Sequence, residues 1–341
     1  MTVPDLNEPA LDRTLELVVR QPRHYHVSQD TVAELETAIL GDARVAPARM
    51  NAVAVSAIVA ATMAAARMGI DAATLFGKLP RRRQTDHDAR DYLAVMMGID
   101  ITKCAPWFVL PARKSVYLFD AWPSKHREIV NFVKSWGVQY AFISSSQAAE
   151  RLSVASDACT FIWVPEGIDA EQYRPRTQGE KDIDVLQLGR KHQPWHDMVH
   201  PAGAGTFSYL YEKTKGQIIF PERRDFVEGL GRAKISICFP SSITHPERAG
   251  DIETMTVRYL QSIASKCLIV GRAPAEMIEL FGYNPVIDAD MSDPTGQIKS
   301  ILRNYQDYAS LVERNYDTVV REHTWKRRWE RMSAILLPHA H

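Results

Sequence analysis

The chain has 341 residues and carries 41 basic and 41 acidic side chains, so its formal net charge is zero. This balance gives no global reason to expect nucleic-acid binding, and none is predicted. Hydrophobic residues make up 45% and charged residues 24% of the sequence, which is typical of a soluble globular protein with about two domains.

The N-terminal half is predicted to alternate strands and helices. Strands are expected over residues 15–19, 115–120 and 140–144. Helices are expected over 30–40, with Ser28 as the N-cap, and over 52–66, 91–97 and 124–135. The run 52–66 carries no charge but is too short to span a bilayer, so we expect a buried core helix there.

A second alternating series is predicted in the C-terminal half. Strands are expected over 184–188, 218–220, 235–239, 267–270 and 285–287. Helices are expected from 196 through 211 and over 224–232, 256–264 and 274–280, followed by two amphipathic helices over 295–315 (broken) and 325–337. A linker rich in charge and turn formers lies near 174–181. The alternation favours an α/β chain with doubly wound parallel sheets.

The four cysteines are scattered and form no Cys-x-x-Cys pair. This spacing does not suit a structural zinc site, and the sequence predicts buried thiols in a reducing compartment. Residues 1–8 are acidic and lack the apolar stretch of a secretory signal. The expected location is therefore the cytoplasm.

Glu253 and Gln261 lie eight positions apart around the start of an apolar helix. Eight helical residues rise about 12 Å, roughly the distance from a sugar ring to a ribose across a diphosphate. The helix N-terminus between them offers free N–H groups and a positive dipole end to the diphosphate. Gln261 can donate and accept hydrogen bonds with ribose hydroxyls. An amphipathic helix with a polar, solvated face would explain the same spacing.

This segment resembles the donor-binding motif of the retaining GT-B glycosyltransferases called family 4. In that family two Glu residues flank a helix N-terminus, and they hold the transferred sugar and the ribose. Glu253 matches the first, whereas Gln261 replaces the second. Further segments resemble the family in the same order along the chain: the inter-domain signature 164–175, the strand end Gly189-Arg190-Lys191, the helix and strand 226–241, and 322–325 before a closing helix.

The resemblance implies a GT-B fold, in which two Rossmann-like doubly wound domains face a central cleft. An acceptor-binding domain would cover residues 1–175 and a nucleotide-sugar-binding domain 176–322. The closing helix, 323–341, would cross back to the first domain. The implied partners are a nucleotide sugar and an unidentified acceptor, which could be a saccharide, a lipid-linked molecule or a small molecule. No cofactor is implied, and the sequence does not indicate an oligomeric state.

The resemblance also implies which cations bind the leaving diphosphate. Arg190, following Gly189 at a strand end, maps well onto the family's Arg, which neutralises a diphosphate bidentately. Lys191 maps less well, because the family's Lys comes a few residues later. Arg248 or Arg258 could supply the second cation. Since Arg258 lies in an otherwise apolar helix, it needs an anionic partner, either a structural carboxylate or the donor.

Three further residues are assigned to the site through the resemblance. Thr254 and Thr256, at the start of the predicted helix, would contact the donor. Asp120 ends a predicted strand at the position that faces the reacting sugar carbon in the family. A turn or helix-cap Asp would explain the same position.

The chain contains three Asp-x-Asp pairs, at 86–88, 182–184 and 288–290. The other glycosyltransferase fold uses such a pair to hold a divalent ion, but neither 182–184 nor 288–290 lies where that fold would need it, and two Asp one residue apart are frequent by chance. No metal is therefore expected, and the helix dipole with the Arg cations would replace it.

Three functions remain open at this stage: a retaining GT-B glycosyltransferase, a related nucleotide-sugar epimerase, and a non-catalytic binding protein with a degenerate donor site. The epimerase would need an additional acid and base, which the sequence does not reveal. The basic loop Arg81-Arg82-Arg83 could favour an anionic or lipid-linked acceptor and a peripheral membrane contact. A solvated loop would explain the same residues.

Overall fold

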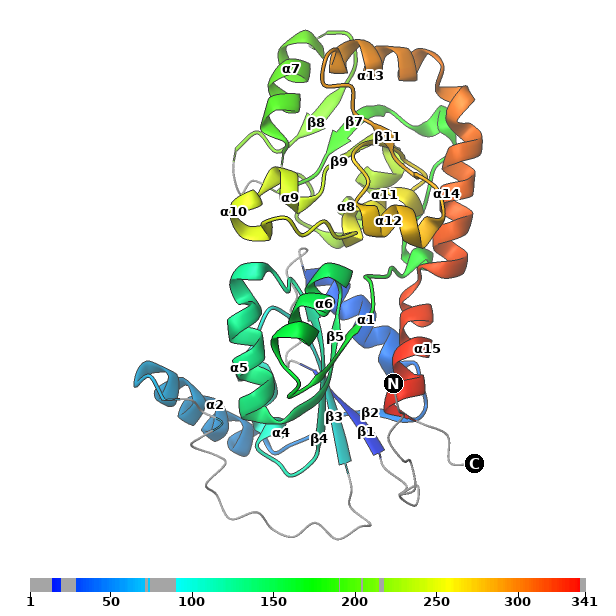
Figure 1. Cartoon of the computed structure of the whole chain (residues 1–341). Helices are drawn as coiled ribbons and strands as arrows, with labels where there is room; N and C mark the ends of the chain where they lie inside the picture. Colours follow the sequence, from blue (N-terminus) through cyan, green and yellow to red (C-terminus); the bar gives the residue numbers. More distant parts are fainter. Residues whose placement is uncertain are drawn as a thin grey trace.

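The computed structural model describes residues 14–19, 29–70, 73, 90–189, 191–203, 205–214 and 218–337. The predictions made for Ser28, for the basic loop 81–83, for the pair 86–88 and for Arg190 lie outside these residues. Two α/β bodies are stacked on one another, each built on a parallel sheet (Figure 1).

The first body contains a six-stranded parallel sheet in the order β2-β1-β3-β4-β5-β6. Its strands are β1 (Thr14–Val18), β2 (Val45–Pro47), β3 (Arg90–Met97), β4 (Arg113–Phe119), β5 (Val138–Ile143) and β6 (Thr160–Trp163). The register pairs Leu93 of β3 with Leu17 of β1 and with Ser115 of β4. The strand order reverses between β1 and β3, and open α/β sheets bind ligands outside such a reversal.

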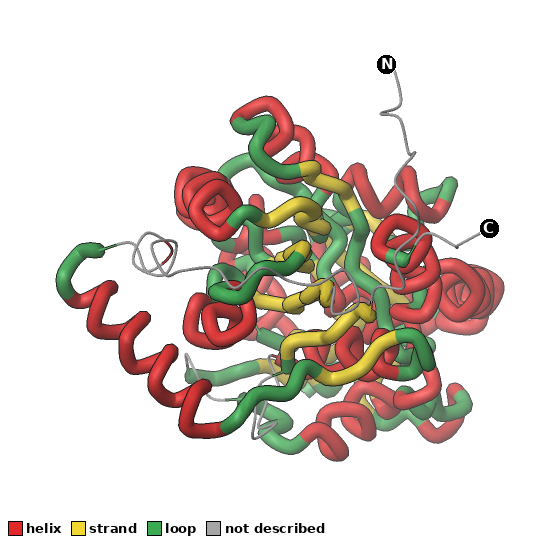
Figure 2. Tube along the Cα trace, turned by 90° about the horizontal axis from the view of Figure 1, so that it is seen from below, coloured by secondary structure: helices red, strands yellow, loops and turns green. Residues whose placement is uncertain are grey.

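Helices cover both faces of this sheet (Figures 1 and 2). One face carries α1 (Asp30–Leu40) and the last helix, α15 (Trp325–Leu336), whose Trp325, Trp329 and Met332 pack against Leu15 and Leu17 of β1. The other face carries α2 (Ala52–Arg67), α4 (Ile101–Phe108), α5 (His126–Trp136) and α6 (Ser146–Ala155). The prediction that the C-terminal helix crosses back to the first domain is therefore confirmed.

The second body contains a five-stranded parallel sheet in the order β11-β10-β9-β7-β8. Its strands are β7 (Ile183–Gln187), β8 (Tyr209–Tyr211), β9 (Ala233–Cys238), β10 (Leu268–Gly271) and β11 (Ile287–Asp288). One face packs against α8 (Arg223–Arg232), α11 (Val257–Ala264), α12 (Ala275–Phe281) and α14 (Ala309–Glu322). The other packs against α7 (Gln193–Gly203) and α13 (Pro294–Arg303).

Short helices occur mainly where the two bodies meet and in the loop after β9. They are the 3₁₀ turns η3 (Pro123–Lys125), η4 (Ala170–Gln172), η5 (Gln178–Glu180) and η6 (Tyr305–Tyr308), and the single-turn helices α9 (Ser241–Thr244) and α10 (Pro246–Ala249). The predicted break in the helix over 295–315 is confirmed, because η6 separates α13 from α14. All four cysteines are buried free thiols.

Three sequence predictions of secondary structure are wrong. Residues 91–97 form the buried strand β3 and not a helix, because a short apolar run does not distinguish a buried strand from a buried helix. The helix predicted through 211 ends at Gly203, and residues 209–211 form β8 instead. Residues 218–220 are not a strand. The pattern also missed β2, α4, α6 and β6.

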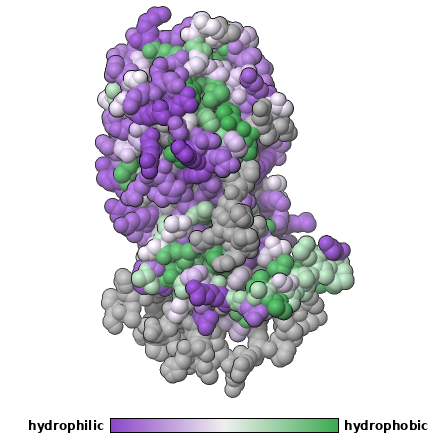
Figure 3. Space-filling view, turned by 180° about the vertical axis from the view of Figure 1, so that it is seen from behind, coloured by the Kyte–Doolittle hydropathy of each residue, from purple (hydrophilic) through white to green (hydrophobic). Residues whose placement is uncertain are grey.

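The prediction that the charge-free run 52–66 is a buried core helix is wrong in its burial. The run forms α2, but only Thr62 and Ala65 of this helix are buried, and Val53 is 77% exposed. Figure 1 shows α2 projecting from the first body, and its apolar residues form part of the hydrophobic surface in Figure 3. In the described part of the chain, no helix is both long and apolar enough to cross a bilayer.

The chain passes between the two bodies beside the start of α15. The Ile168 N–H donates to the His323 carbonyl at 3.1 Å, and the Trp325 N–H donates to the Ile168 carbonyl at 3.1 Å. A Cβ on Gly167 would lie 2.9 Å from the Trp325 nitrogen, so only glycine allows this approach. Two segments that resemble GT-B enzymes, 164–175 and 322–325, therefore meet where the chain passes between the two bodies.

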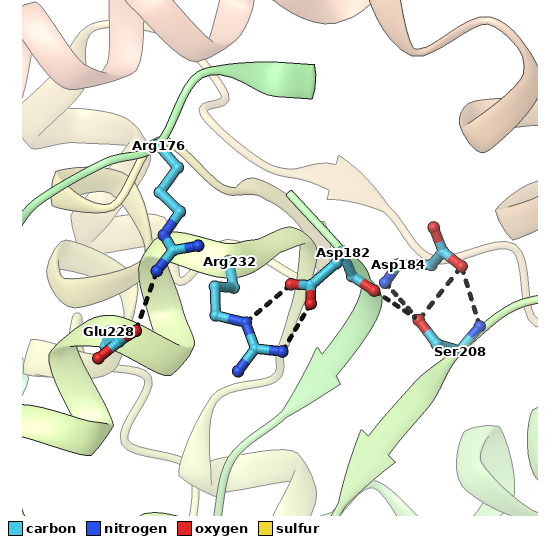
Figure 4. Close-up of polar contacts among 6 residues, drawn as sticks. All are labelled: Arg176, Asp182, Asp184, Ser208, Glu228 and Arg232. Carbon is cyan, nitrogen blue, oxygen red and sulfur yellow. Dashed lines mark hydrogen bonds and ion pairs between the residues drawn. The ribbon is translucent and has the colours of Figure 1, made fainter. Parts of the chain in front are cut away.

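Ionic contacts attach the following linker to the second body (Figure 4). Arg176 pairs with Glu228 of α8 at 2.9 Å, and Arg232 pairs with Asp182 at 2.6 Å. At the start of β7, Asp184 accepts hydrogen bonds from the Ser208 N–H and hydroxyl. These contacts hold the linker at the amino end of the second sheet, away from the carboxyl ends where the cavity described below opens.

Candidate functional site

A cavity of about 500 Å³ lies between the two bodies, at the carboxyl ends of strands from both sheets. It is lined from the first body by Thr31, Met97, Phe119, Asp120, Trp122 and Glu166. The second body contributes Leu188, Gly189, Glu212, Ile218, Ile219, Phe220, Phe226, Phe239, Ser241, Thr244, Arg248, Thr256, Val257, Arg258 and Gln261. The lining combines an aromatic and aliphatic part with a few converging polar groups, as small-molecule sites do. We call it the cleft cavity.

Asp120 lies in the cleft cavity directly after β4. Its φ of 55° is in the left-handed region, which non-glycine residues rarely adopt and which is often found at functional sites. Its carboxylate pairs with Arg248 of α10 at 2.5 Å, and the Arg248 guanidinium lies 5.4 Å from the centre of the Trp122 ring. The structure therefore brings together two predicted site residues, one from each body.

The N-terminus of α11 faces the same cavity. The Val257 N–H, the first of the helix, donates to Glu166 Oε2 at 2.6 Å. Burial of Glu166 is the largest cause that raises its pKa to about 8; the Val257 hydrogen bond lowers it, and the carboxylates of Asp120 and Glu276 raise it. This carboxyl group is therefore mostly protonated at pH 7.

Sequence reasoning did not select Glu166. It is covered only by the inter-domain signature 164–175, without a role of its own. The available signal was an ionisable residue directly after the apolar run 161–165. Such a residue in a buried segment often has a perturbed pKa and a functional role.

Arg258 projects into the cleft cavity beside Gly189. Gly189 has a φ of 65°, and a Cβ there would lie 2.7 Å from Arg258 Nη2, so glycine makes room for the guanidinium. Arg248, which also lines the cavity, is paired with Asp120, but Arg258 forms no ion pair with any carboxylate among the described residues. Of the two partners predicted for Arg258, a structural carboxylate is not found among the described residues.

Gln261 lies on α11, lines the cleft cavity and is 8% exposed. The Tyr173 hydroxyl lies against both Gln261 and Arg223. Arg223 in turn pairs with Glu34 at 2.6 Å and with Asp30 at 3.1 Å, both on α1 of the first body. Burial raises the pKa of Glu34 to about 6. Gln261 is therefore packed against the contact that joins the two bodies.

Of the remaining predicted site residues, Glu253, Thr254 and Lys191 do not line the cleft cavity, whereas Thr256 does. Glu253 lines a separate cavity of about 610 Å³ in the second body, where it pairs with Arg272 at 3.3 Å. The Thr254 hydroxyl is buried and donates to Glu276 at 3.0 Å. Lys191 Nζ donates to the Glu212 carbonyl at 3.0 Å and lies over the Tyr211 ring.

The helical spacing argument for Glu253 and Gln261 is wrong in its geometry. It assumed that eight helical residues separate the two side chains. In the structure α11 begins at Val257, and the four residues from Glu253 to Thr256 precede it. The Glu253 N–H donates to Gln147 of α6 at 2.7 Å, which directs this segment along the first body. The two side chains therefore open into different cavities.

The Asp-x-Asp pairs of the second body have basic or local partners. Asp182 pairs with Arg232, as Figure 4 shows, and Asp184 pairs with Lys234 at 2.7 Å. Asp290 accepts hydrogen bonds from Ser292, while Asp288 lies beside Asn284. Among the described residues, no group of three or more His, Cys, Asp or Glu is placed to hold a metal ion.

Comparison with known proteins identifies the fold. No protein-family model matches the chain, and no curated protein matches it in sequence. Its structure is similar to that of the Anabaena protein HepE solved with UDP and glucose, with a TM-score of 0.57 at 8% identity over 95% of this chain and 99% of HepE. The chain has the GT-B fold.

Two further solved structures have the same GT-B architecture over nearly their whole length. A glycosyltransferase from Rickettsia africae has a TM-score of 0.54 at 10% identity, covering 96% of this chain and 99% of that protein. Sucrose-phosphate synthase from Thermosynechococcus elongatus has a TM-score of 0.57 at 11% identity, covering 95% and 98%. In GT-B terms, the first body is the N-terminal domain, the second is the C-terminal domain, and the cleft cavity lies between them.

Proposed function

We propose that this GT-B protein is a glycosyltransferase that moves a sugar from a nucleotide-diphosphate donor to an acceptor, without a metal and with retention of the anomeric configuration. One observation carries the proposal. The Arg258 guanidinium has no carboxylate partner among the described residues and lies at the N-terminus of α11, inside a cavity that both domains line. A guanidinium and a helix N-terminus together suit a diphosphate.

The remaining lining residues fit the other parts of such a donor. Gln261 is placed to hydrogen-bond a ribose. Phe220 and Phe226 offer apolar surface for a base. Asp120, from the opposite domain, faces the position left for the sugar. HepE was solved with UDP and glucose, so a UDP-linked sugar is the first donor to test.

The proposed role of charge explains why no metal is needed. Negative charge develops on the departing diphosphate, and preorganised cations stabilise it most strongly where water is excluded. Arg258 would supply this charge, together with Arg190, which was assigned to the same role from the sequence. Glu253, which the sequence assigned to the sugar, opens into the neighbouring cavity and has no role in this proposal.

Partners and location are proposed from the sequence. The acceptor would be a saccharide, a lipid-linked molecule or a small molecule bound by the N-terminal domain, and the protein would act in the cytoplasm. A peripheral membrane contact through residues 81–83 belongs to the same proposal.

A GT-B epimerase is the second candidate, because the cleft cavity holds two carboxyl groups in unlike surroundings. Glu166 is buried and mostly protonated at pH 7, whereas Asp120 is paired with Arg248. A pair of this kind can supply an acid and a base. An epimerase would change the sugar of its donor without needing an acceptor.

A ligand and product assay separates these functions. UDP, UDP-glucose and other nucleotide sugars are screened by thermal shift with EDTA present, and nucleotide release is then measured with and without a pool of acceptors. A glycosyltransferase gives a metal-independent shift and acceptor-dependent UDP release. An epimerase gives a new nucleotide sugar and no free UDP, and a binding protein gives the shift alone. A strict requirement for Mg²⁺ or Mn²⁺ would contradict the metal-free proposal.

A further inference from the structure

Glu166 is held beside the N-terminus of α11. The flanking Gly167 is fixed against Trp325, and the Arg328 guanidinium donates to the Glu166 backbone carbonyl at 3.3 Å. The side chain is only 7% exposed and lines both the cleft cavity and a small adjoining cavity. These contacts fix the backbone directly after Glu166, and the Val257 N–H holds the carboxyl group.

The two oxygens of Glu166 have different surroundings. Oε2 accepts the Val257 N–H at 2.6 Å. Oε1 forms no hydrogen bond with any described residue, and the residue lines the cavity where Arg258 and the helix N-terminus would bind a diphosphate. A carboxyl oxygen that faces a cavity without a protein partner can form a hydrogen bond with water or with a ligand there. Oε1 is therefore available to a ligand in the cleft.

We propose that Glu166 binds the donor diphosphate as a neutral carboxylic acid, so that Oε2 keeps the Val257 N–H while the proton on Oε1 is donated to a phosphate oxygen. This inference rests on the proposed function. An ionised carboxylate at the same place would repel the diphosphate across a short, buried distance. The neutral acid does not repel the diphosphate and can donate a hydrogen bond to it. Glu166 therefore contacts the nucleotide sugar.

The charged and titratable groups around Glu166 favour the neutral form. Burial is the largest cause that raises the pKa of Glu166 to about 8. The nearby carboxylates of Asp120, at the end of β4, and of Glu276, on α12, also raise it. Glu276 itself accepts hydrogen bonds from the Ser146 N–H and hydroxyl, from Thr254 and from the Met255 N–H.

The basic groups near Glu166 interact with partners other than its carboxyl group. Arg328 donates to the Glu166 carbonyl and to His323, whose pKa is lowered to about 3 by burial and by Arg328. The Tyr117 hydroxyl donates to the Val164 carbonyl at 3.0 Å. Arg248 is paired with Asp120. Among the described residues, no cation pairs with the Glu166 carboxyl group, so only the Val257 hydrogen bond opposes the effect of burial and like charge on its pKa.

Proton linkage follows from this arrangement. Below pH 8 Glu166 already carries the proton that the diphosphate needs. Above pH 8 the free protein has lost it, and each binding event must take one proton from solution. Affinity for the donor is therefore expected to fall about tenfold per pH unit above pH 8. Glu166→Gln removes this dependence, because its amide donates a hydrogen bond but does not ionise.

The test is calorimetric titration of the full-length protein with UDP-glucose between pH 6.5 and 9.5. Both phosphates of this probe are diesters, so they do not titrate in the range. The wild type should lose affinity steadily above pH 8, whereas Glu166→Gln should stay nearly flat. Glu247→Gln is the matched control: this exposed residue of α10 does not line the cleft cavity, so the variant should follow the wild type.

A second readout needs only the wild type and therefore does not depend on folding of the variant. Titrations at pH 9 in two buffers with different ionisation enthalpies should reveal uptake of close to one proton per UDP-glucose bound. Parallel pH profiles for wild type and Glu166→Gln, or no proton uptake at pH 9, would overturn the assignment of Glu166. Failure of UDP-glucose, UDP and the other nucleotide sugars to bind at every pH would instead overturn the proposed function.

Discussion

At the scale of single residues, two cations with the same predicted duty have different surroundings. Lys191 is occupied by the Glu212 carbonyl and the Tyr211 ring, whereas Arg258 faces the cleft cavity without a carboxylate partner among the described residues. Their positions in the sequence do not show which of them is engaged by protein groups, because those contacts come from other segments of the chain. Their contacts decide the ranking.

Arg258→Ala should therefore lower kcat/KM by about 10²- to 10³-fold, the effect of losing about 2.7–4 kcal/mol of transition-state stabilisation. Arg258→Lys should recover only part of this, because the bidentate fork is absent. Lys191→Ala serves as the control and should cost far less. Steady-state kinetics of the three variants check this order. A larger loss for Lys191→Ala than for Arg258→Ala would show that the assignment of the cations is reversed.

The pKa of Glu166 also predicts an effect on stability. In the unfolded chain this carboxyl group titrates near its model value of 4.5, and in the folded protein near 8. Between these values the folded state binds more protons, so wild-type stability falls as pH rises from 4.5 through 8.

Because Gln does not titrate, the difference in Tm between Glu166→Gln and wild type should grow in favour of the variant from pH 5 to pH 8. Thermal melts at intervals of half a pH unit measure this, with Glu247→Gln as a control whose difference from wild type stays constant. A difference that is independent of pH for Glu166→Gln would show that the carboxyl group is ionised in the folded state.

The site residues were only partly predictable from the sequence. Asp120, Arg248, Arg258 and Gln261 line one cavity as a motif-based assignment expects. Glu253 does not, because the segment before α11 is not helical and is attached to Gln147 of the other domain. Contacts between residues more than 100 positions apart leave no local signal. The same is true of Glu166, whose importance comes from burial beside α11.

At the scale of elements, the crossing between the domains depends on the close approach of residues 167–169 to 323–325. Gly167→Ala should lower the free energy of unfolding by about 1–3 kcal/mol, because a Cβ there would meet the Trp325 backbone at 2.9 Å. Gly179→Ala is the matched control: its Cβ would meet nothing within 4 Å. Urea denaturation compares the two. Equal effects would contradict the close approach.

Most elements followed from local pattern, and the errors have physical causes. Amphipathic helices such as α8 and α13 have one exposed face, so their period is visible in the sequence. The strand β3 is buried on both faces of the sheet, and its continuous apolar run resembles a buried helix. The apolar composition of α2 suggested that this helix is buried. Whether other parts of the chain cover a helix cannot be seen from the residues of the helix itself.

At the scale of the whole molecule, Arg223 links the two domains near the donor site. It pairs with Glu34, whose side chain is 3% exposed, and with Asp30, and it lies 5.1 Å from the centre of the Tyr173 ring. Removing one partner leaves a buried carboxylate without its cation, which is more costly than removing both.

Arg223→Met should therefore lower the free energy of unfolding by about 3 kcal/mol, and Arg223→Met with Glu34→Gln should lower it less. Donor affinity should also fall in the single variant, since Tyr173 lies between Arg223 and Gln261. Urea denaturation and UDP-glucose titration of the wild type, of Arg223→Met, of Glu34→Gln and of the double variant form a double-mutant cycle. Additive losses would show that the two residues do not interact.

The two-domain α/β architecture was predictable because strand and helix periods recur along both halves of the chain, and because parallel sheets place their carboxyl ends around one cleft. The course of residues 241–253 was not predictable. This loop forms α9 and α10 and separates the cleft cavity from the cavity that contains Glu253 and Arg272. Its path depends on contacts with the opposite domain.

The central claim is that the cleft cavity binds a nucleotide-diphosphate sugar through Arg258 and the N-terminus of α11. A crystal structure of the protein with UDP-glucose, grown in the presence of EDTA, tests it most directly. The account predicts the diphosphate between Arg258 and Glu166, with the ribose at Gln261 and the glucose facing Asp120. Binding of the nucleotide in the neighbouring cavity beside Arg272 and Glu253, with the cleft cavity empty, would contradict it.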